Sequence, residues 1–189
     1  MDLVRASHLY KVFGKNERQV IERLKAGESR EELASLGTAA VIDVSFEVAK
    51  GETFVVMGLS GSGKSTLIRM INGLWSPSEG TVEVAGKVVS DMNDAQLRAL
   101  RRDHVSMVFQ HFALLPHLTV RENAAYGLKL QGKLKQKERL EKANEWLNTV
   151  GLNGWGDKYP HQLSGGMQQR VGLARALAAE TDILLMDEA

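Results

Sequence analysis

The sequence contains no cysteine, which excludes disulfide bonds and thiolate metal sites and is typical of a reducing compartment. No apolar stretch approaches the roughly 18–20 residues that span a bilayer. The formal net charge is only +1, so bulk electrostatics indicate no nucleic-acid partner and no anionic-membrane surface. The first residues, MDLVRASHLYKVFG, lack the apolar core of a secretory signal. We therefore expect a cytoplasmic chain that reaches a membrane only through a partner.

What the sequence does contain is a series of strand patterns, in a chain long enough for one domain with a smaller inserted lobe. SHLYKVFG predicts a short edge strand, and the continuous apolar run ETFVVMG predicts a strand buried on both faces. GTVEVAGKVV predicts a hairpin around Ala85 and Gly86. The segments with strand patterns are residues 7–14, 40–48, 52–58, 80–89, 104–110 and 182–188.

Between the first two strand patterns, residues 15–37 are charged and helical in character. The apolar residues of ERQVIERLK share one helix face, and Gly27 is placed to end that helix. Ser29 and Glu32 have the spacing of a capping box for a second short helix that Gly37 would end. The segment is either a solvated surface excursion or a specific addition to the fold.

From about Phe112 the pattern becomes helical. Thr119 and Glu122 have capping-box spacing, and a later helix has apolar residues at i, i+3, i+7 and i+10 from Leu140, with Gly151 placed to end it. GMQQRVGLARALAAE predicts another helix before the final strand, DILLMDE. Strand–helix alternation on both sides of a helical stretch predicts an α/β core with an inserted helical lobe.

GLSGSGKST fits the phosphate-loop pattern G-x-x-x-x-G-K-[ST], with Gly58 as its first residue. Glycines allow backbone N–H groups to surround phosphate oxygens, and the following helix adds its dipole. Lys64 would reach the β- and γ-phosphates of a nucleotide, and the Ser65 hydroxyl would ligate Mg²⁺. The competing interpretation is a glycine-rich turn with an incidental lysine, although a strand pattern before the loop and a helix pattern after it favour the phosphate loop.

Two adjacent carboxylates, Asp187 and Glu188, follow the apolar run ILLM. Alone, such a pair after a strand is typical of a turn or a helix cap. Phosphate-loop proteins, however, carry a second hydrophobic strand that ends in an Asp holding Mg²⁺. The sequence therefore predicts Asp187 in that role and Glu188 as the general base that polarises the attacking water.

LSGGMQQR stands directly before a predicted helix, with Ser164 as its N-cap and Gly165 and Gly166 leaving bare N–H groups at the positive end of the dipole. One nucleotide does not need two phosphate cradles. We therefore expect this second cradle to close over ATP held by the phosphate loop of another copy.

In the order and spacing of these motifs, with Gln110 ending SMVFQ, nearly the whole chain resembles the ATP-binding-cassette (ABC) ATPases. The resemblance implies an α/β P-loop NTPase with a RecA-like core, an antiparallel β subdomain and an inserted helical subdomain, the C-terminal part of the core being missing. It also implies three parts. Residues 1–110 would be the N-terminal part of the core, with the two-helix insertion at 15–37 and the phosphate loop at 58–66. Residues 111–165 would be the helical subdomain, and residues 166–189 the signature helix with the Asp-Glu strand.

The resemblance also assigns roles. Gln110 would contact Mg²⁺ and the attacking water and link the core to the helical lobe, and Phe13 would stack on adenine, with Tyr10 as the competing candidate. The catalytic residues would be Lys64, Gln110 and Glu188. The Mg²⁺ ligands would be Ser65, Gln110 and Asp187. The residues binding ATP would be Phe13, Gly58, Ser60, Gly61, Ser62, Gly63, Lys64, Ser65, Thr66, Ser164, Gly165 and Gly166.

A narrower resemblance rests on MGLSGSGKSTLIRMINGL, MVFQHFALLPHLTV and YPHQLSGGMQQRVGLARALA, which are similar to ATPase subunits of importers for quaternary amines. That family carries an insertion like residues 15–37. The resemblance implies ATP hydrolysis that energises uptake of glycine betaine, proline betaine, choline or carnitine. The implied partners are transmembrane permease subunits, a second copy in a head-to-tail dimer and, indirectly, an external substrate-binding protein. The implied location is the cytoplasmic face of the cell membrane.

The stretch HFALLPHLTV is apolar for a segment before a helix, and two interpretations remain open. Its apolar residues are Phe112, Leu114, Leu115 and Leu118. They form the core of the helical lobe or, as the family resemblance implies, the floor of a groove that receives a cytoplasmic helix of the permease, and one residue can serve both roles.

The family pattern continues beyond MDEA, so we expect a fragment whose last strand is an exposed hydrophobic edge and whose own activity is in doubt. The alternatives are an ATP-binding module without turnover and an importer ATPase for another small solute, such as an amino acid. A chromosome-structure or DNA-repair ATPase would carry long heptad coiled coils between the motifs, which this sequence lacks.

Overall fold

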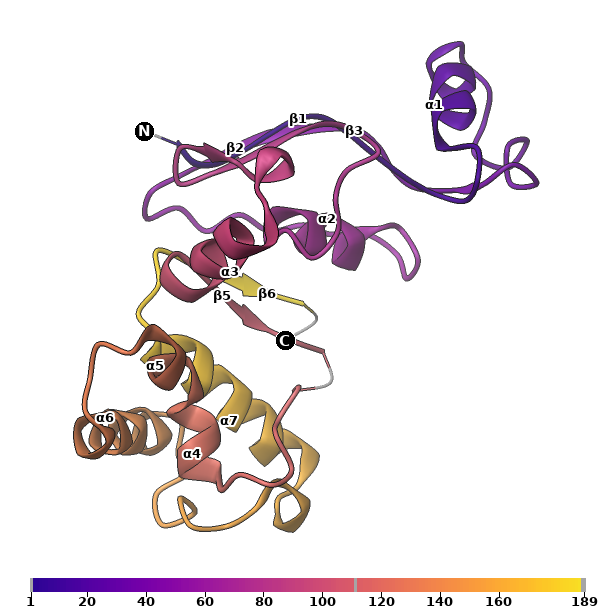
Figure 1. Ribbon diagram of the computed structural model, residues 1–189. Coiled ribbons are helices and arrows are strands. Elements are labelled where there is room, and N and C mark those ends of the chain that lie inside the picture. Colours follow the sequence, from indigo (N-terminus) through magenta and orange to yellow (C-terminus); the bar gives the residue numbers. More distant parts are fainter. Residues whose placement is uncertain (1, 111, 188–189) are drawn as a thin grey trace. The chain divides into compact units, whose positions relative to one another are not determined.

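The structure is a computed structural model that describes residues 2–110 and 112–187 (Figure 1). The chain divides into two compact units, Met1–Leu97 and Arg98–Ala189. This division does not test the three-part division implied by the motifs. Within the described residues, every helix is too short or too polar to cross a lipid bilayer.

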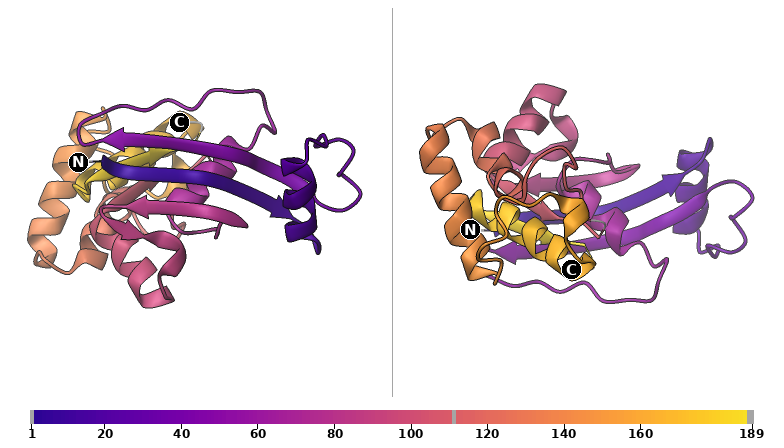
Figure 2. Two further views of the ribbon diagram at one scale, coloured as in Figure 1. Left: turned by 90° about the horizontal axis from the view of Figure 1, so that it is seen from above. Right: turned by 90° about the horizontal axis from the view of Figure 1, so that it is seen from below.

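The first unit is built on a four-stranded antiparallel sheet with the strand order β2-β1-β3-β4 (Figure 2). Its strands are β1 (Asp2–Phe13), β2 (Thr38–Ala49), β3 (Glu79–Val84) and β4 (Lys87–Val88). The predicted edge position of SHLYKVFG is wrong, because β1 pairs with β2 on one side and with β3 on the other. Alternating polarity reveals which faces of a strand are buried, but it does not reveal how many neighbours the strand has.

The predicted hairpin is confirmed between β3 and β4. Ala85 and Gly86 form the two-residue turn with φ of 50° and 74°. Positive φ at both turn positions matches the twist of the flanking strands, so Gly at the second position is favourable. The 3₁₀ turn η1 (Val89–Asp91) follows directly.

The predicted strand ETFVVMG is wrong, because residues 52–59 are irregular. Phe54, Val55 and Met57 are 45%, 67% and 87% exposed, and Phe54 stacks on Phe46 of β2 at a centroid distance of 4.8 Å. A strand exists only where a neighbouring strand completes its hydrogen-bond ladder. An apolar run predicts burial, but it supplies no partner.

Between β1 and β2 the chain forms the insertion, residues 14–37, with one helix, α1 (Glu17–Lys25). The predicted end of this helix is confirmed. Gly27 has φ of 97°, its amide donates to the carbonyl of Leu24, and the Glu28 amide donates to the carbonyl of Arg23. This pair of bonds is the Schellman motif, which satisfies the last helical carbonyls.

The second helix expected in the insertion is absent, and residues 30–36 form turns instead. The Ser29 and Glu32 contacts of a capping box are nevertheless present. Too few residues follow before Gly37 to offset the cost of helix nucleation.

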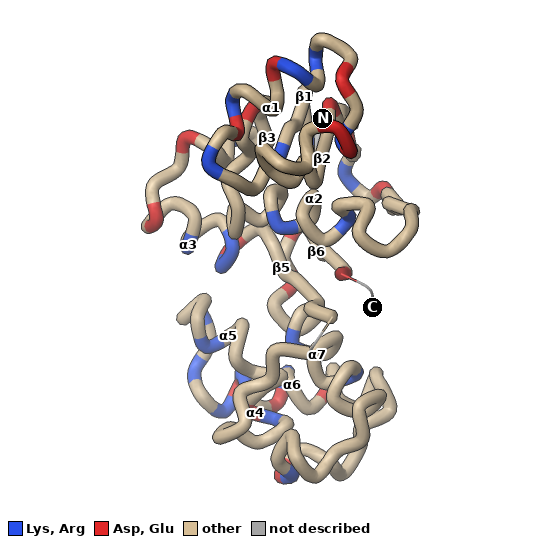
Figure 3. Tube along the Cα trace, turned by 90° about the vertical axis from the view of Figure 1, so that its right-hand side faces the viewer, with Lys and Arg blue, Asp and Glu red and all other residues tan. Residues whose placement is uncertain are grey.

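The insertion has a small apolar core shared with the sheet, whereas its surface carries charges of both signs (Figure 3). Leu33 is fully buried, and Leu24 and Leu36 pack against the cluster from partly buried positions. The buried members are Tyr10, Val12, Val20, Ile21, Leu33 and Ala39. This shared core attaches the insertion to the strands on which it stands.

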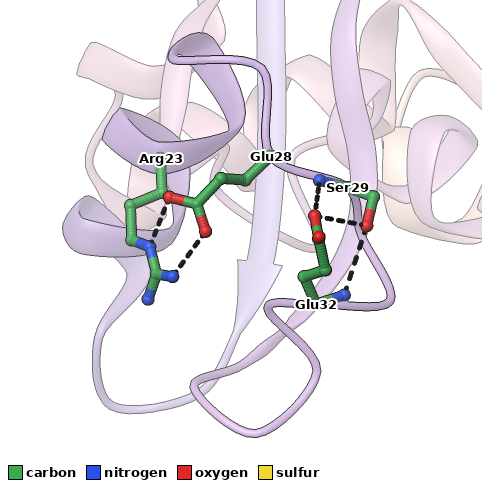
Figure 4. Close-up of polar contacts among 4 residues, drawn as sticks. All are labelled: Arg23, Glu28, Ser29 and Glu32. Atoms are coloured by element: carbon green, nitrogen blue, oxygen red, sulfur yellow. Dashed lines mark hydrogen bonds and ion pairs between the residues drawn. The ribbon is translucent and has the colours of Figure 1, made fainter.

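Two polar clusters fasten the turn after α1 (Figure 4). Arg23 Nε donates to Glu28 Oε1 at 2.7 Å, and this hydrogen bond holds the pKa of Glu28 below its ordinary value. The amide and the hydroxyl of Ser29 both donate to Glu32 Oε2 at 2.8 Å, and these bonds lower the pKa of Glu32.

The second unit pairs β5 (Val105–Val108) with β6 (Ile183–Met186) in parallel, so both predicted strands are confirmed. Between them lie α4 (Val120–Ala124), α5 (Tyr126–Gln131), α6 (Gln136–Thr149), the 3₁₀ turn η2 (Pro160–Gln162) and α7 (Gly165–Ala178). The helix α3 (Asp94–Asp103), which was not predicted, begins in the first unit and ends in the second.

The long helix α7 contacts α4, α5 and α6 in the helical lobe (Figure 1). The predicted Thr119–Glu122 capping box is confirmed at the start of α4. Gly151, with φ of 73°, follows the C-cap of α6 as expected. The buried core of the lobe is formed by Val120, Ala124, Ala125, Ala143, Leu147, Leu152, Leu163, Val171 and Ala174.

Leu33→Ala removes a fully buried side chain from the core of the insertion. We expect a loss of about 2–4 kcal/mol in the free energy of local opening, because burial is lost and a cavity remains. Hydrogen exchange of the α1 amides measures this change. Leu130→Ala on α5, whose side chain is 56% exposed, serves as the control and should leave those amides unchanged. Equal exchange in the two variants would contradict the insertion core.

Glu32 makes the turn after α1 sensitive to acid. Its folded-state pKa lies below the ordinary 4.5, so its bonds from Ser29 stabilise the turn above pH 4.5 and are lost as the pH falls through the lowered pKa. The Ser29 amide shift, followed by NMR, should therefore titrate with a midpoint below 4.5, and this step should vanish in Glu32→Gln. A midpoint at or above 4.5 would show that the bonds do not form.

Candidate nucleotide-binding site

The loop of residues 58–63 turns into α2 (Lys64–Ile71), the helix predicted after it. Gly63 is the N-cap, with φ of 92°, and a Cβ added there would lie 2.0 Å from the carbonyl oxygen of Ala40 in β2. Gly61 has φ of 78°, and a Cβ there would meet no atom within 4 Å. Gly63 therefore has to be glycine for two reasons, backbone conformation and close approach, whereas Gly61 borders open space.

Lys64 folds back over this loop. Its Nζ donates to the carbonyls of Gly58 at 2.9 Å and Leu59 at 2.8 Å. The first intrahelical bond of α2 runs from the Leu67 amide to the Gly63 carbonyl, so the preceding amides point beyond the helix end. An ammonium, glycine backbone and the positive end of a helix dipole thus meet at one loop, an arrangement suited to an anion.

The other predicted residues of this motif differ in burial. Ser60 and Ser62 are exposed, and a Cβ added at Gly58 would lie 2.6 Å from Ser62 Oγ. Ser65 is half-buried in the first turn of α2, and Thr66 is buried. The hydroxyl groups of Ser65 and Thr66 therefore lie on the first turn of α2, directly after Lys64.

The two aromatic candidates for base stacking differ in burial. Tyr10 is 5% exposed in the core of the insertion, whereas Phe13 at the end of β1 is 38% exposed. Phe13 pairs with Thr38 at the start of β2, two residues before the Ala40 that the phosphate loop approaches. Burial and position therefore favour Phe13.

The predicted signature lies at the start of α7. Ser164 is the N-cap, and its side chain accepts a hydrogen bond from the Met167 amide at 3.4 Å. A Cβ added at Gly165 or Gly166 would meet no atom within 4 Å. The first turn of α7 is therefore open on the side of its glycines, and the amides there lie at the positive end of the dipole.

Gln110 and Asp187 follow the carboxyl ends of the parallel strands β5 and β6. The Asp187 side chain is buried, with the residue 2% exposed, and its amide donates to the Val108 carbonyl at 3.0 Å. Gln110 is exposed. Because the strands are parallel, both residues lie at the same edge of the sheet, where α/β proteins bind ligands. Glu188 lies outside the described residues.

The predicted residues thus fall into two sets, one in each unit. The first unit holds Phe13 and the phosphate loop, and the second holds Gln110, Asp187 and the signature.

Sequence reasoning missed two side chains that hold the segment after Gln110. Arg175 of α7 donates to the carbonyls of Phe112 at 2.9 Å and Ala113 at 2.7 Å, and burial lowers the pKa of its guanidinium. Phe112 and Ala113 have φ of 56° and 47°, a region that side chains other than glycine rarely adopt. Arg175 therefore stabilises an unfavourable backbone conformation, and no local pattern signals a contact over this sequence separation.

The other missed residue is Asn123 of α4, which is fully buried. Its amide group donates to the carbonyls of Leu115 and Leu118, and its oxygen accepts from the Leu115 amide. Leu114 packs against the core of the lobe. Part of the apolar stretch after Gln110 therefore serves as core.

Arg175→Ala removes both donors from the left-handed pair at Phe112 and Ala113. We expect a local loss of about 1–3 kcal/mol, because the carbonyls lose charged partners, and faster hydrogen exchange in residues 112–115. Arg170→Ala is the matched control, since Arg170 likewise donates to two carbonyls, of Val150 and Gly151, at the end of α6. If both variants speed hydrogen exchange in residues 112–115 equally, the stabilising role of Arg175 is contradicted.

Comparisons with known proteins show the family of this chain. The family described as "ABC transporter" matches residues 41–189. The glycine betaine transport ATP-binding protein OpuAA of Bacillus subtilis (strain 168) is 52% identical over 188 residues, 98% of this chain and 45% of the relative. The glycine betaine/proline betaine transport system ATP-binding protein ProV of Escherichia coli (strain K12) is 49% identical over 187 residues, 96% of this chain and 46% of the relative.

Among solved structures, the dimeric post-hydrolysis state of the ATP-binding cassette MJ0796 bound to ADP and Pi has a TM-score of 0.83 at 34% identity, covering 97% of this chain and 73% of that chain. The chain spans about half the length of the curated relatives it matches. The ABC ATPase fold expected from the motifs is confirmed, and so is the resemblance to the betaine transport proteins. The chain belongs to the ABC transporter ATP-binding family.

Proposed function

We propose that this chain binds ATP and forms part of the ATP-hydrolysing subunit of an importer. The observation that carries the proposal is the phosphate loop, where the Lys64 ammonium lies on the loop carbonyls next to the start of α2. A triphosphate offers that ammonium stronger acceptors than two carbonyls, because phosphate oxygens carry full negative charge whereas carbonyl oxygens are only dipolar. Lys64 then moves from the loop to the β- and γ-phosphates.

The other side chains divide the remaining work. Phe13 offers an exposed ring to the adenine base, and the glycines of the loop allow amides to approach the phosphates. Glu188 holds the attacking water and takes its proton, and Gln110 orients that water. Each of these roles follows from the position of the residue in its motif.

Ser65, Gln110 and Asp187 would hold Mg²⁺. A hydroxyl, an amide oxygen and a carboxylate are the hard oxygen ligands that this ion prefers, and the buried Asp187 follows the end of β6, so the residues present fit the ion. When bound there, Mg²⁺ would neutralise charge on the transferred phosphate.

A second copy of the chain completes the site. The open glycine turn at the start of α7 is a second anion cradle, which one nucleotide does not need. The structurally similar cassette MJ0796 is a dimer with ADP and Pi. Two copies therefore pair head to tail, with Ser164, Gly165 and Gly166 of each closing over the ATP on the phosphate loop of the other.

The transported solute is a quaternary amine, glycine betaine or proline betaine. This rests on the curated relatives, whose names state transport of these compounds. Permease subunits bind the chain at the cytoplasmic face of the cell membrane, and an external binding protein delivers the solute to them. A second candidate function, ATP binding without turnover, is kept because the chain spans only about half of those relatives.

Lys64→Ala should weaken ATP binding at least tenfold, because a charged hydrogen-bond donor to the phosphates is lost. Isothermal titration with ATP and Mg²⁺ measures this change. Lys87→Ala, in the exposed part of β4, is the matched control and should bind as the unaltered chain does. Undiminished binding by Lys64→Ala would sink the phosphate-loop assignment.

Glu188→Gln separates the two candidate functions, because an amide is a poor base but an acceptable neighbour for ATP. If the chain hydrolyses ATP, phosphate release should fall about 100-fold or more in this variant while the Kd for ATP changes little. ATP binding with no phosphate release from the unaltered chain would instead favour binding without turnover.

A further inference from the structure

Phe13 is in contact with a second aromatic ring that the motifs do not include. The ring centroids of Phe13 and Trp75 lie 5.1 Å apart, and the ring planes are nearly perpendicular, at 77°. Edge-to-face pairs of this kind are favourable beyond the area that they bury. A perpendicular neighbour can cover at most one face of the Phe13 ring, so Trp75 leaves at least one face of the ring uncovered.

Trp75 is held in place by α2, the helix that begins at Lys64. The Trp75 amide donates to the carbonyl of Arg69 at 3.0 Å, and the guanidinium of Arg69 lies over the Trp75 indole, 4.9 Å from its centroid. The indole is thus fixed to the C-terminal end of the same helix whose N-terminal end carries the phosphate loop.

The strand that carries Phe13 is fastened to the segment after Trp75. Ser78 donates its amide to the Tyr10 carbonyl at 2.8 Å, and the Val12 amide donates to Ser78 Oγ at 3.1 Å. Residues 75–78 therefore run beside the end of β1. Hydrogen bonds therefore attach residues 75–78 to α2 at one end and to β1 at the other, and they set the distance between Phe13 and α2.

Lys11 supplies a second contact of the Phe13 ring. Its Nζ lies over the ring, 5.2 Å from the centroid. A lysine side chain on a strand is flexible and solvated, so a planar base with a larger face can take its place. The ring contacts therefore separate into a fixed one, from Trp75, and a displaceable one, from Lys11.

We propose that Trp75 is a positioning residue for the nucleotide base: it holds the Phe13 ring so that a free face meets adenine, and it thereby makes the site prefer a nucleotide over a bare polyphosphate. This inference rests on the proposed function, in which Phe13 stacks on the base. Trp75 acts through Phe13, and phosphate binding by the loop of residues 58–63 is independent of it.

The test compares ATP with inorganic tripolyphosphate, which presents the same phosphates without a base. Isothermal titration in Mg²⁺ gives both Kd values for the unaltered chain and for Trp75→Leu, Trp75→Phe and Phe13→Leu. Trp75→Leu should weaken ATP binding about three- to tenfold through loss of the ring pair, and tripolyphosphate binding should not change. Trp75→Phe keeps an aromatic edge and should restore most of the loss.

Trp155→Leu is the control for removing a tryptophan, since Trp155 is a partly exposed residue of the second unit and should affect neither ligand. The ratio of the Kd for tripolyphosphate to the Kd for ATP is insensitive to a partly unfolded sample, because unfolded chains bind neither ligand. Trp75→Leu is expected to lower this ratio. If it leaves the ratio unchanged, by weakening both ligands equally or neither, while Phe13→Leu lowers it, the inference is overturned and base stacking stands. If Phe13→Leu itself leaves the ratio unchanged, base stacking on Phe13 is wrong, and the role of Trp75 falls with it.

Discussion

The approach of Gly63 to the carbonyl of Ala40 is the contact on which the geometry of the phosphate loop depends. A side chain at residue 63 would collide with the backbone of β2, and the positive φ of 92° would be unfavourable for it as well. With glycine there, the start of α2 lies directly against β2. The orientation of the first helical amides, and therefore the anion cradle, follows from this contact between backbones.

The same strand links the cradle to the insertion. β2 begins at Thr38, which pairs with Phe13, and the insertion opens and closes between these two residues. At its neck, a Cβ on Gly14 would lie 3.0 Å from Gly37 Cα. The insertion thus adds its own core to the sheet, while the end of β1 at Phe13 and the start of β2 at Thr38 remain paired.

Features set by short sequence windows were predictable. The Thr119–Glu122 box and the glycines after α1 and α6 form where expected, because each depends only on residues within one helical turn. The family was predictable too, since its motifs fix spacing as well as residue type. The sequence could not predict that ETFVVMG would lack strand partners, because a ladder needs a second segment from elsewhere.

The candidate site shows the same division. Lys64, Asp187 and Ser164 were predicted from motifs, and the structure gives each a defined local setting. The choice between Phe13 and Tyr10 required the core of the insertion, which buries Tyr10. Arg175 and Trp75 act across long sequence separations, on backbone carbonyls and on an aromatic ring. A single sequence carries no signal for such pairs.

The parallel pairing of β5 with β6 has a consequence for synthesis on the ribosome. Ser106 of β5 and Thr181, next to β6, are hydrogen-bonded yet lie 75 residues apart. At roughly 5–20 residues per second, β5 waits on the order of 4–15 seconds for its partner. During that interval α4, α5, α6 and α7 emerge, and these helices contact one another, so the helical lobe can form before β6 arrives. The lobe is then a folded spacer that returns the chain to an unpaired apolar strand, and translation speed through residues 109–182 sets how long that strand is exposed.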